Sequence, residues 1–445
     1  MALKSRYRPK KLACFYALFN TLSAIKPATV QEQAWSTRLI FTRWLTNERR
    51  SVLIKGPEQM EKSFMIVLSL LAATLMLSPI LSLSAELPAE RNHDEQSFPG
   101  EDWSRASPES LGFSPSGIDR ALAYAKNEGS TAGLVIVHGL VIAEWGDIAR
   151  KSNLHSARKS FMNALVGIAV SRGQLSLDAT LQELGIDDET PSLTSTEKQA
   201  TVRMLLQARS GIYHPTVYET AGMSAAKPLR YSHDPGTFWY YNNWDFNTIG
   251  AIYEKATGER IFDAIKVLLA DPLNMQDYLP SDGRYVDGGF ATRYPAYPFN
   301  MSARDLARFA LLYLHRGRWR DHQIVPANWV DESTRPYSNT STGGYGYMWW
   351  TSTPAHGQRT KKMALLRPTF WADGHLGQYA VVVPSLDLVV VNLVDARLTS
   401  KHMGQSQMEE LMWLVEHAAN VSDIGTEPSS VNLKITPTRQ SQATE

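Results

Sequence analysis

Residues 131–147 read Thr-Ala-Gly-Leu-Val-Ile-Val-His-Gly-Leu-Val-Ile-Ala-Glu-Trp-Gly-Asp. Two apolar runs rich in β-branched residues flank His138-Gly139, a pattern that is typical of a β-hairpin. Shortly after this segment come Ser156 and Lys159, which open an apolar stretch from Phe161 onwards. The hairpin therefore predicts the start of a sheet, followed directly by a helix with polar residues in its first turn.

The elements on either side of this hairpin predict an α+β fold. A helix is expected before it, at Pro115–Asn127, and the stretch 160–335 lacks strand character. Strands return near the end of the chain, and sheet sequence at both ends around a helical insert favours a sheet flanked by helices, with a site in the cleft between sheet and insert. Within the insert we expect helices at Ser160–Arg172, Thr201–Gln207, Trp244–Thr257, Ile261–Leu269 and Ser302–Arg316. After it we expect strands at Phe370–Ala372, Tyr379–Pro384 and Leu388–Leu393, and a last helix at Gln405–Ala418.

Composition excludes several classes of protein. The 445 residues carry a formal net charge of +1, so there is no overall field to attract nucleic acid. The single cysteine, Cys14, allows neither an intramolecular disulfide nor a Cys-based metal site. The sequence has no His/Asp/Glu cluster with metal-ligand spacing and no Gly-rich phosphate loop after a strand. We therefore expect no metal and no cofactor.

The first hundred residues contain a stretch, 60–85, that resembles an export signal. Residues 60–85 contain an apolar run after Lys62 and small residues before a candidate cut after Ala85, as in a signal peptide. This predicts a periplasmic or secreted protein; the alternative is a retained anchor in the inner membrane facing the periplasm, so that contact with the membrane is transient or through this segment. A start at Met60 would leave 1–59 as an unassigned, mis-annotated stretch, in which Arg49-Arg50 faintly resembles a twin-arginine signal.

The remaining segments divide by composition. Residues 86–105 are polar and predict a linker. The tail 421–445, rich in Ser, Thr, Gln and Pro, predicts disorder. One folded domain is thus expected at 106–420.

A serine and a lysine three positions apart lie on one face of a helix, about 5–6 Å apart at Cβ. A lysine whose pKa is lowered by burial can then take the proton of the serine. Of the four such pairs in the sequence, only Ser156/Lys159 follows the hairpin and opens an apolar helix. The alternative for this pair is that the serine only caps the helix and the lysine only extends its charged end to solvent. The pairs are Ser23/Lys26, Ser156/Lys159, Ser195/Lys198 and Ser224/Lys227.

The segment His155-Ser156-Ala157-Arg158-Lys159-Ser160-Phe161 resembles the first motif of the penicillin-recognising serine hydrolases. That family includes class C β-lactamases, D-alanyl-D-alanine carboxypeptidases, related esterases and 6-aminohexanoate-dimer hydrolases, and the motif type here is most similar to the last. The resemblance implies a β-lactamase-like fold with an inserted all-helical subdomain at about 160–335. It also implies Ser156 as nucleophile and Lys159 as its activator.

A second motif of this family, Tyr-x-Asn, has two possible registers, Tyr240/Asn242 and Tyr241/Asn243. The spacing from the preceding Pro-Gly selects the second register. The resemblance implies that Tyr241 acts as general base with Lys159, because a phenol near an ammonium ionises more easily. It implies that Asn243 hydrogen-bonds Lys159 and a substrate carbonyl. A turn that only packs the interdomain face is the alternative.

The third motif is His375-Leu376-Gly377, where β-lactamases usually have Lys-Thr-Gly. Histidine, with an ordinary pKa near 6.5, is mostly neutral at pH 7, so the site resembles those of the esterases and amidases. The resemblance implies that Gly377 lets substrate lie flat on the strand and that the N–H of Gln378, with that of Ser156, forms an oxyanion hole. Tyr218, which follows Arg209-Ser210-Gly211 together with Tyr213 and His214, is expected to contact substrate.

These residues predict a serine hydrolase that cleaves a small-molecule ester, amide or peptide-like substrate through an acyl-enzyme on Ser156. The first alternative is a class C-like β-lactamase or D-alanyl-D-alanine carboxypeptidase. The second is a membrane-anchored binding or sensor protein of the same fold that does not turn over. Nothing in the sequence names the substrate or the oligomeric state.

Overall fold

The computed structural model describes residues 98–419 except 189–190, 290, 342 and 353–367. All of the described residues belong to one compact unit, Arg91–Glu445. The stretch 1–59, the signal predicted at 60–85 and the tail 421–445 lie outside the described residues. None of the described helices is long and apolar enough to cross a membrane.

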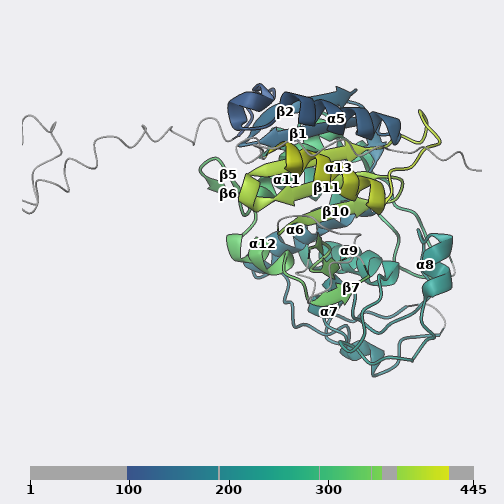
Figure 1. Ribbon diagram of the computed structural model, residues 1–445. Helices are drawn as coiled ribbons and strands as arrows, with labels where there is room; N and C mark the ends of the chain where they lie inside the picture. The colour runs from purple at the N-terminus through teal and green to yellow at the C-terminus, as the bar shows by residue number, and fades with distance from the viewer. Residues whose placement is uncertain (1–97, 189–190, 290, 342, 353–367, 420–445) are drawn as a thin grey trace, which may run out of the picture. The chain divides into compact units, whose positions relative to one another are not determined.

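An antiparallel sheet forms the centre of the described fold, with its eight strands in the order β2-β1-β12-β11-β10-β9-β8-β7 (Figure 1). The predicted hairpin supplies β1 and β2, and β1 pairs with β12, so strands from the two ends of the domain lie side by side near one edge of the sheet. The strands are β1 Ala132–Val137, β2 Leu140–Gly146, β7 Ser338–Thr340, β8 Gly343–Tyr345, β9 Trp350–Thr351, β10 Phe370–Gly374, β11 Gln378–Val383 and β12 Leu388–Leu393.

Both faces of the sheet are buried at its strands β1, β11 and β12, which explains why these strands are almost wholly apolar. Successive side chains of a strand point to opposite faces. Leu134 and Ile136 of β1 face the core that includes α11 (Ala303–Leu314), whereas Val135 and Val137 face the core that includes α5 (Pro115–Asn127) and α13 (Gln405–Ala418). In Figure 1, α5 and α13 lie beside the upper strands of the sheet. The predicted α+β class is therefore confirmed.

The helical part follows the hairpin in the chain, and in Figure 1 most of it lies below the sheet. It contains α6 Arg158–Ser171, α7 Val202–Leu206, α8 Ala221–Ala226, α9 Asn243–Thr257 and α10 Ile261–Ile265. A further helix, α12 Ala327–Ser333, comes after α11 in the chain. Single turns are η2 Pro108–Leu111, η3 His155–Ala157, η4 Glu197–Gln199, the π-helical η5 Lys266–Ala270, η6 Pro280–Asp282 and η7 Pro384–Leu386. Two short ladders complete the set, β3 Lys151–Asn153 with β4 Asn300–Ser302 and β5 Arg318–Trp319 with β6 His322–Gln323.

The helical subdomain is shorter than predicted. The strand β4 ends it near residue 300, and α11, which was expected to belong to it, packs instead on β1, β11 and β12. The reason is that amphipathicity shows that a helix has a buried face but not what covers that face. The strands β7, β8 and β9 were missed because they have only two or three residues each.

The linker predicted at 86–105 is partly wrong. Trp103 is only 4% exposed, and the Phe98 ring contacts Trp319 edge-on at 5.0 Å. The buried guanidinium of Arg308 donates hydrogen bonds to the carbonyls of Gly100 and Glu101. Residues 98–105 are therefore part of the folded domain, held by aromatic packing that a polar composition does not reveal.

An aromatic stack joins α6, the helix after the hairpin, to α11, the helix that packs on the sheet. Phe161 of α6 is fully buried, and its ring lies 3.7 Å from that of Phe309 in α11. We predict that Phe161→Ala lowers the free energy of unfolding by about 3–5 kcal/mol, because it removes buried area and leaves a cavity. Chemical denaturation measures this loss. Leu229, 84% exposed, is the control: Leu229→Ala should change the same quantity by less than about 0.5 kcal/mol. Equal losses would contradict the prediction.

Candidate active site

Ser156 lies in the single turn η3, directly between β3 and α6. The residue before it, His155, has a φ of 47°, a left-handed backbone that is uncommon outside glycine. This sharp turn is held because the His155 N–H donates to Asn153 Oδ1 at 2.9 Å. The turn presents the Ser156 side chain, which is half-exposed, at the start of a buried helix.

Lys159 lies beneath this serine and is only 1% exposed. Its Nζ lies 2.8 Å from Ser156 Oγ and 2.8 Å from the Tyr241 hydroxyl. The same nitrogen is 4.5 Å from the ring centroid of Tyr241 and 4.8 Å from that of Phe246. The structure thus brings Ser156, Lys159 and Tyr241 together, although they are far apart in the sequence.

The surroundings of Lys159 favour its neutral amine. Burial lowers the pKa of Lys159 well below its ordinary value, and the neighbouring positive charge of Arg158 lowers it further. Asp373 of β10 acts in the opposite direction. A neutral amine at hydrogen-bond distance from a serine hydroxyl can accept its proton.

Tyr241 is held by the loop that leads into α9. The side chain of Asn242 caps this helix, and its amide donates to the Ile212 carbonyl at 2.6 Å and to Asp245 Oδ1 at 2.8 Å. Burial raises the pKa of Tyr241 above its ordinary value. The expectation that this phenol ionises more easily is therefore wrong, because loss of hydration disfavours the phenolate.

The roles expected for Asn243 differ from its contacts. Asn243 is 1% exposed, and its Nδ2 donates to the Tyr218 carbonyl at 2.6 Å. The expected hydrogen bond to Lys159 is not among the contacts of the described residues. The alternative tyrosine, Tyr240, donates to the Met223 carbonyl at 2.7 Å, so Tyr241 is the one that contacts Lys159.

Tyr218 borders the turn His155–Ala157, which we call the nucleophile turn after the role expected of Ser156. The Tyr218 hydroxyl accepts a hydrogen bond from Asn153 Nδ2 at 2.9 Å, and its ring is stacked at 6.2 Å on that of His155. The neighbouring candidates point elsewhere, since Tyr213 contacts His233 and His214 bonds the Pro191 carbonyl. Among these three, Tyr218 is the one placed beside Ser156.

The turn between β10 and β11 carries the third motif. His375 is exposed, and its ring lies edge-on to His155 with centroids 5.6 Å apart. Burial, followed by the charges of His375, Arg158 and Lys159, lowers the pKa of His155 to about 4. His155 is therefore neutral at pH 7, and the two imidazoles form one rim of the site, next to the turn that carries Ser156.

Gly377 and Gln378 follow in the same turn, and the structure changes the reason given for each. Gly377 has a φ of +116°, and a Cβ there would lie 2.8 Å from Met403 Cβ. Packing against Met403 thus requires glycine at this position, and the role of Gly377 toward a substrate stays a prediction. The buried Gln378 side chain donates to the Val394 carbonyl and accepts from its N–H, which leaves the backbone of Gln378 as the group that can serve the site.

Sequence reasoning missed two charged residues of the site, Arg158 and Asp373. Arg158 is fully buried beside Lys159. Asp373 lies half-buried in β10 next to Gly374, and burial raises its pKa to about 7. The signal that could have found them is a charged residue within an apolar helix or strand. In the helix, this signal was applied to Lys159 but not to Arg158, and in the strand it was not applied to Asp373.

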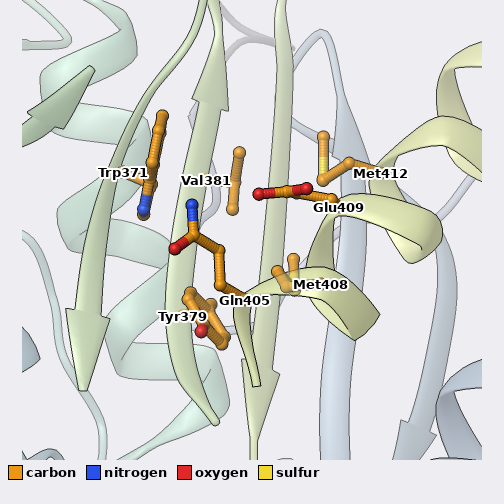
Figure 2. Close-up of a pocket in the computed structure, with 7 residues that line it drawn as sticks. All are labelled: Trp371, Tyr379, Val381, Gln405, Met408, Glu409 and Met412. Atoms are coloured by element: carbon orange, nitrogen blue, oxygen red, sulfur yellow. The ribbon is translucent and has the colours of Figure 1, made fainter. Parts of the chain in front are cut away.

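The cavity drawn in Figure 2 is not this site. It has a volume of about 20 Å³ and lies between β10–β11 and α13, on the face of the sheet opposite the α6 core. That volume is close to the space of one water molecule. The lining residues are Trp371, Tyr379, Val381, Gln405, Met408, Glu409 and Met412. No group of three or more His, Cys, Asp or Glu suited to a metal ion occurs among the described residues.

Comparison with known proteins places this arrangement in a family. The family model described as Beta-lactamase matches residues 151–404, which is more than half of the chain and includes every residue of the site. The chain therefore belongs to the Beta-lactamase family, and the resemblance to the penicillin-recognising serine hydrolases is confirmed.

The individual relatives have low sequence identity to this chain. Esterase EstB from Burkholderia gladioli is 29% identical over 166 residues, which is 31% of this chain and 41% of EstB. The chain thus matches about two fifths of the length of this curated relative. Two solved structures show the same fold at 17% identity and a TM-score of 0.50. One, a Bacillus anthracis protein named as a 6-aminohexanoate-dimer hydrolase, covers 74% of this chain and 89% of its own. The other, a Bacteroides dorei protein named as a β-lactamase, covers 69% and 99%.

The position of Ser156 depends on a close approach of backbones at Gly374. A Cβ on Gly374 would lie 2.2 Å from the Leu154 carbonyl oxygen and 3.2 Å from the Ala157 nitrogen. We predict that Gly374→Ala slows labelling of Ser156 by a fluorophosphonate about 10²-fold, because it pushes the nucleophile turn away from the sheet. In contrast, Gly222→Ala on the exposed helix α8, where a Cβ would meet only Thr220 Oγ1 at 4.0 Å, should label at the wild-type rate. Wild-type labelling of Gly374→Ala would contradict the prediction.

Proposed function

We propose that this protein hydrolyses a small-molecule ester or amide through an acyl-enzyme on Ser156. The observation that carries the proposal is the position of Lys159 Nζ, which is 2.8 Å from both Ser156 Oγ and the Tyr241 hydroxyl. Because burial favours the neutral forms of both Lys159 and Tyr241, Lys159 is the base and Tyr241 is a proton donor.

Acylation then proceeds in a defined order. The Lys159 amine accepts the hydroxyl proton of Ser156 while Oγ attacks the carbonyl carbon, and the carbonyl oxygen gains a negative charge. As the tetrahedral intermediate collapses, the bond to the leaving group breaks. The Tyr241 hydroxyl gives its proton to the leaving oxygen or nitrogen and receives one from the Lys159 ammonium, so that both groups return to their neutral forms.

The oxyanion requires hydrogen-bond donors at the nucleophile turn. The turn η3 packs against both β10 and β11, which brings the backbone of Ser156 close to Gln378 at the start of β11. The N–H groups of Ser156 and Gln378 therefore supply the proposed oxyanion hole. Water then attacks the carbonyl carbon of the acyl-enzyme and gives a proton to Tyr241 as Tyr241 passes its own proton to Lys159. The bond to Ser156 Oγ breaks, Lys159 returns the proton to Oγ, and the acid product leaves.

An ester or amide is favoured over a β-lactam by the exposed rim of the site. A lysine in the third motif would offer a fixed charge to a substrate carboxylate, whereas here His375 faces the neutral ring of His155. The name of the relative EstB, an esterase, supports the same choice. The family model, described as Beta-lactamase, keeps β-lactam hydrolysis as the second candidate.

The proposal predicts that Ser156→Ala loses activity by about 10⁴-fold or more and that Tyr241→Phe loses about 10²–10⁴-fold. Both variants should unfold at the wild-type temperature. The measurement is hydrolysis of p-nitrophenyl butyrate, with the acyl adduct detected by intact mass. The exposed Ser195 has the same spacing to a lysine, so Ser195→Ala is the matched control and should keep full activity. Undiminished turnover by Ser156→Ala would end the proposal.

A substrate panel separates the candidate reactions. We expect p-nitrophenyl esters or linear anilides to be turned over at least tenfold faster than nitrocefin, measured as kcat/KM with the purified protein. A preference for nitrocefin would make the protein a β-lactamase. A stable adduct on Ser156 with every ester, amide and β-lactam, and no turnover, would instead show a binding or sensor protein.

A further inference from the structure

Arg158 is a fully buried cation directly beside the base of the proposed reaction. It is 0% exposed and precedes Lys159 at the start of α6. Taking a charge out of water is costly unless the charge is paired and hydrogen-bonded. A guanidinium does not escape this cost by losing its proton, because arginine stays protonated in proteins.

The contacts of Arg158 offset this cost only in part. Its Nη1 donates to the His155 carbonyl at 2.9 Å, and the guanidinium lies 4.8 Å from the ring centroid of Tyr297 and 5.1 Å from that of Tyr218. Within the described residues, Nε and Nη2 of Arg158 have no hydrogen-bond partner. No Asp or Glu of the described part forms a salt bridge with it. The charge is thus held mainly by aromatic faces.

We infer that Arg158 is a positioning residue of the Ser156 site, whose permanent positive charge keeps Lys159 in the neutral amine form and whose hydrogen bond to His155 holds the nucleophile turn. The inference rests on the proposed function, because it requires Lys159 to be the base. It explains why an uncompensated charge is retained at this point of the fold.

The other charged and titratable groups around Lys159 are few. From its own turn comes His155, whose lowered pKa makes it neutral, with His375 beyond it. From the loop before α9 comes the neutral Tyr241, and Tyr297 lies on the far side of Arg158.

From β10 comes Asp373, which opposes Arg158. Its charge raises the pKa values of Lys159 and Tyr241, while the charge of Arg158 lowers both. Substitutions of these two residues should therefore shift the pH dependence in opposite directions.

The test is the pH dependence of kcat/KM for p-nitrophenyl butyrate between about pH 5 and pH 9.5. The neutral form of Lys159 is the active one, so the rate rises as pH passes the pKa of Lys159. In Arg158→Gln this rise should move upward by about one pH unit, giving about tenfold lower kcat/KM on the rising limb and recovery at high pH. In Asp373→Asn the rise should move downward.

Two further variants keep the result interpretable. Arg158→Met also removes the charge, and an apolar chain of similar size is often tolerated in place of a buried charge; it serves if Arg158→Gln does not fold. Because the pKa of Asp373 is about 7, its own ionisation falls in the measured range. Arg158→Gln is therefore repeated in the Asp373→Asn background, where that ionisation is absent.

The outcomes separate the inference from the proposed function. A wild-type protein without a Ser156-dependent burst of p-nitrophenol would overturn the proposed function itself. An active wild-type protein whose rising limb stays in place in both Arg158 variants, with a loss that is uniform across pH, would leave Arg158 a purely structural role and overturn the inference alone. An upward shift in both variants supports it.

Discussion

The contact on which the site depends is the one between the buried Lys159 nitrogen and two hydroxyls, those of Ser156 and Tyr241. An ordinary lysine is protonated at neutral pH and cannot accept a proton. Removal from water, assisted by a neighbouring positive charge, favours the neutral amine that can act as a base. The fold must therefore bury Lys159 completely and yet leave the serine above it accessible, and most of the surrounding packing serves these two demands.

Three parts of the chain meet these demands by different means. The helix α6 buries Lys159 through its packing on α9 and β10. The absence of a side chain at Gly374 lets the strand β10 approach the backbone of the nucleophile turn. The cap of α9 fixes the Tyr241 loop, since Asn242 is bound to a carboxylate, Asp245, that accepts two further hydrogen bonds from Ser210. Each is a backbone constraint on the position of one reacting group.

The sequence predicted those features that arise from local physical chemistry. The helix Pro115–Asn127 and the strand Leu388–Leu393 have their predicted limits, because apolar periodicity and capping residues act over a few positions. Long-range features were not predictable in this way. The covering of the sheet by α11 and the pairing of Asn243 with Tyr218 depend on partners far away in the chain, and the direction of the pKa of Tyr241 depends on burial that only the assembled fold produces.

The two residues missed in the sequence show what a motif contains and what it leaves out. A spacing such as Ser156/Lys159 specifies which atoms can meet, but the reactivity of these atoms depends on the charges around them. Arg158 and Asp373 lower and raise the pKa of the same amine. Since opposite charges act most strongly where water is excluded, small changes at these two positions can adjust the base without moving it. In the proposed reaction, the nucleophile and its base can thus be kept while the pH range of activity is varied by their neighbours.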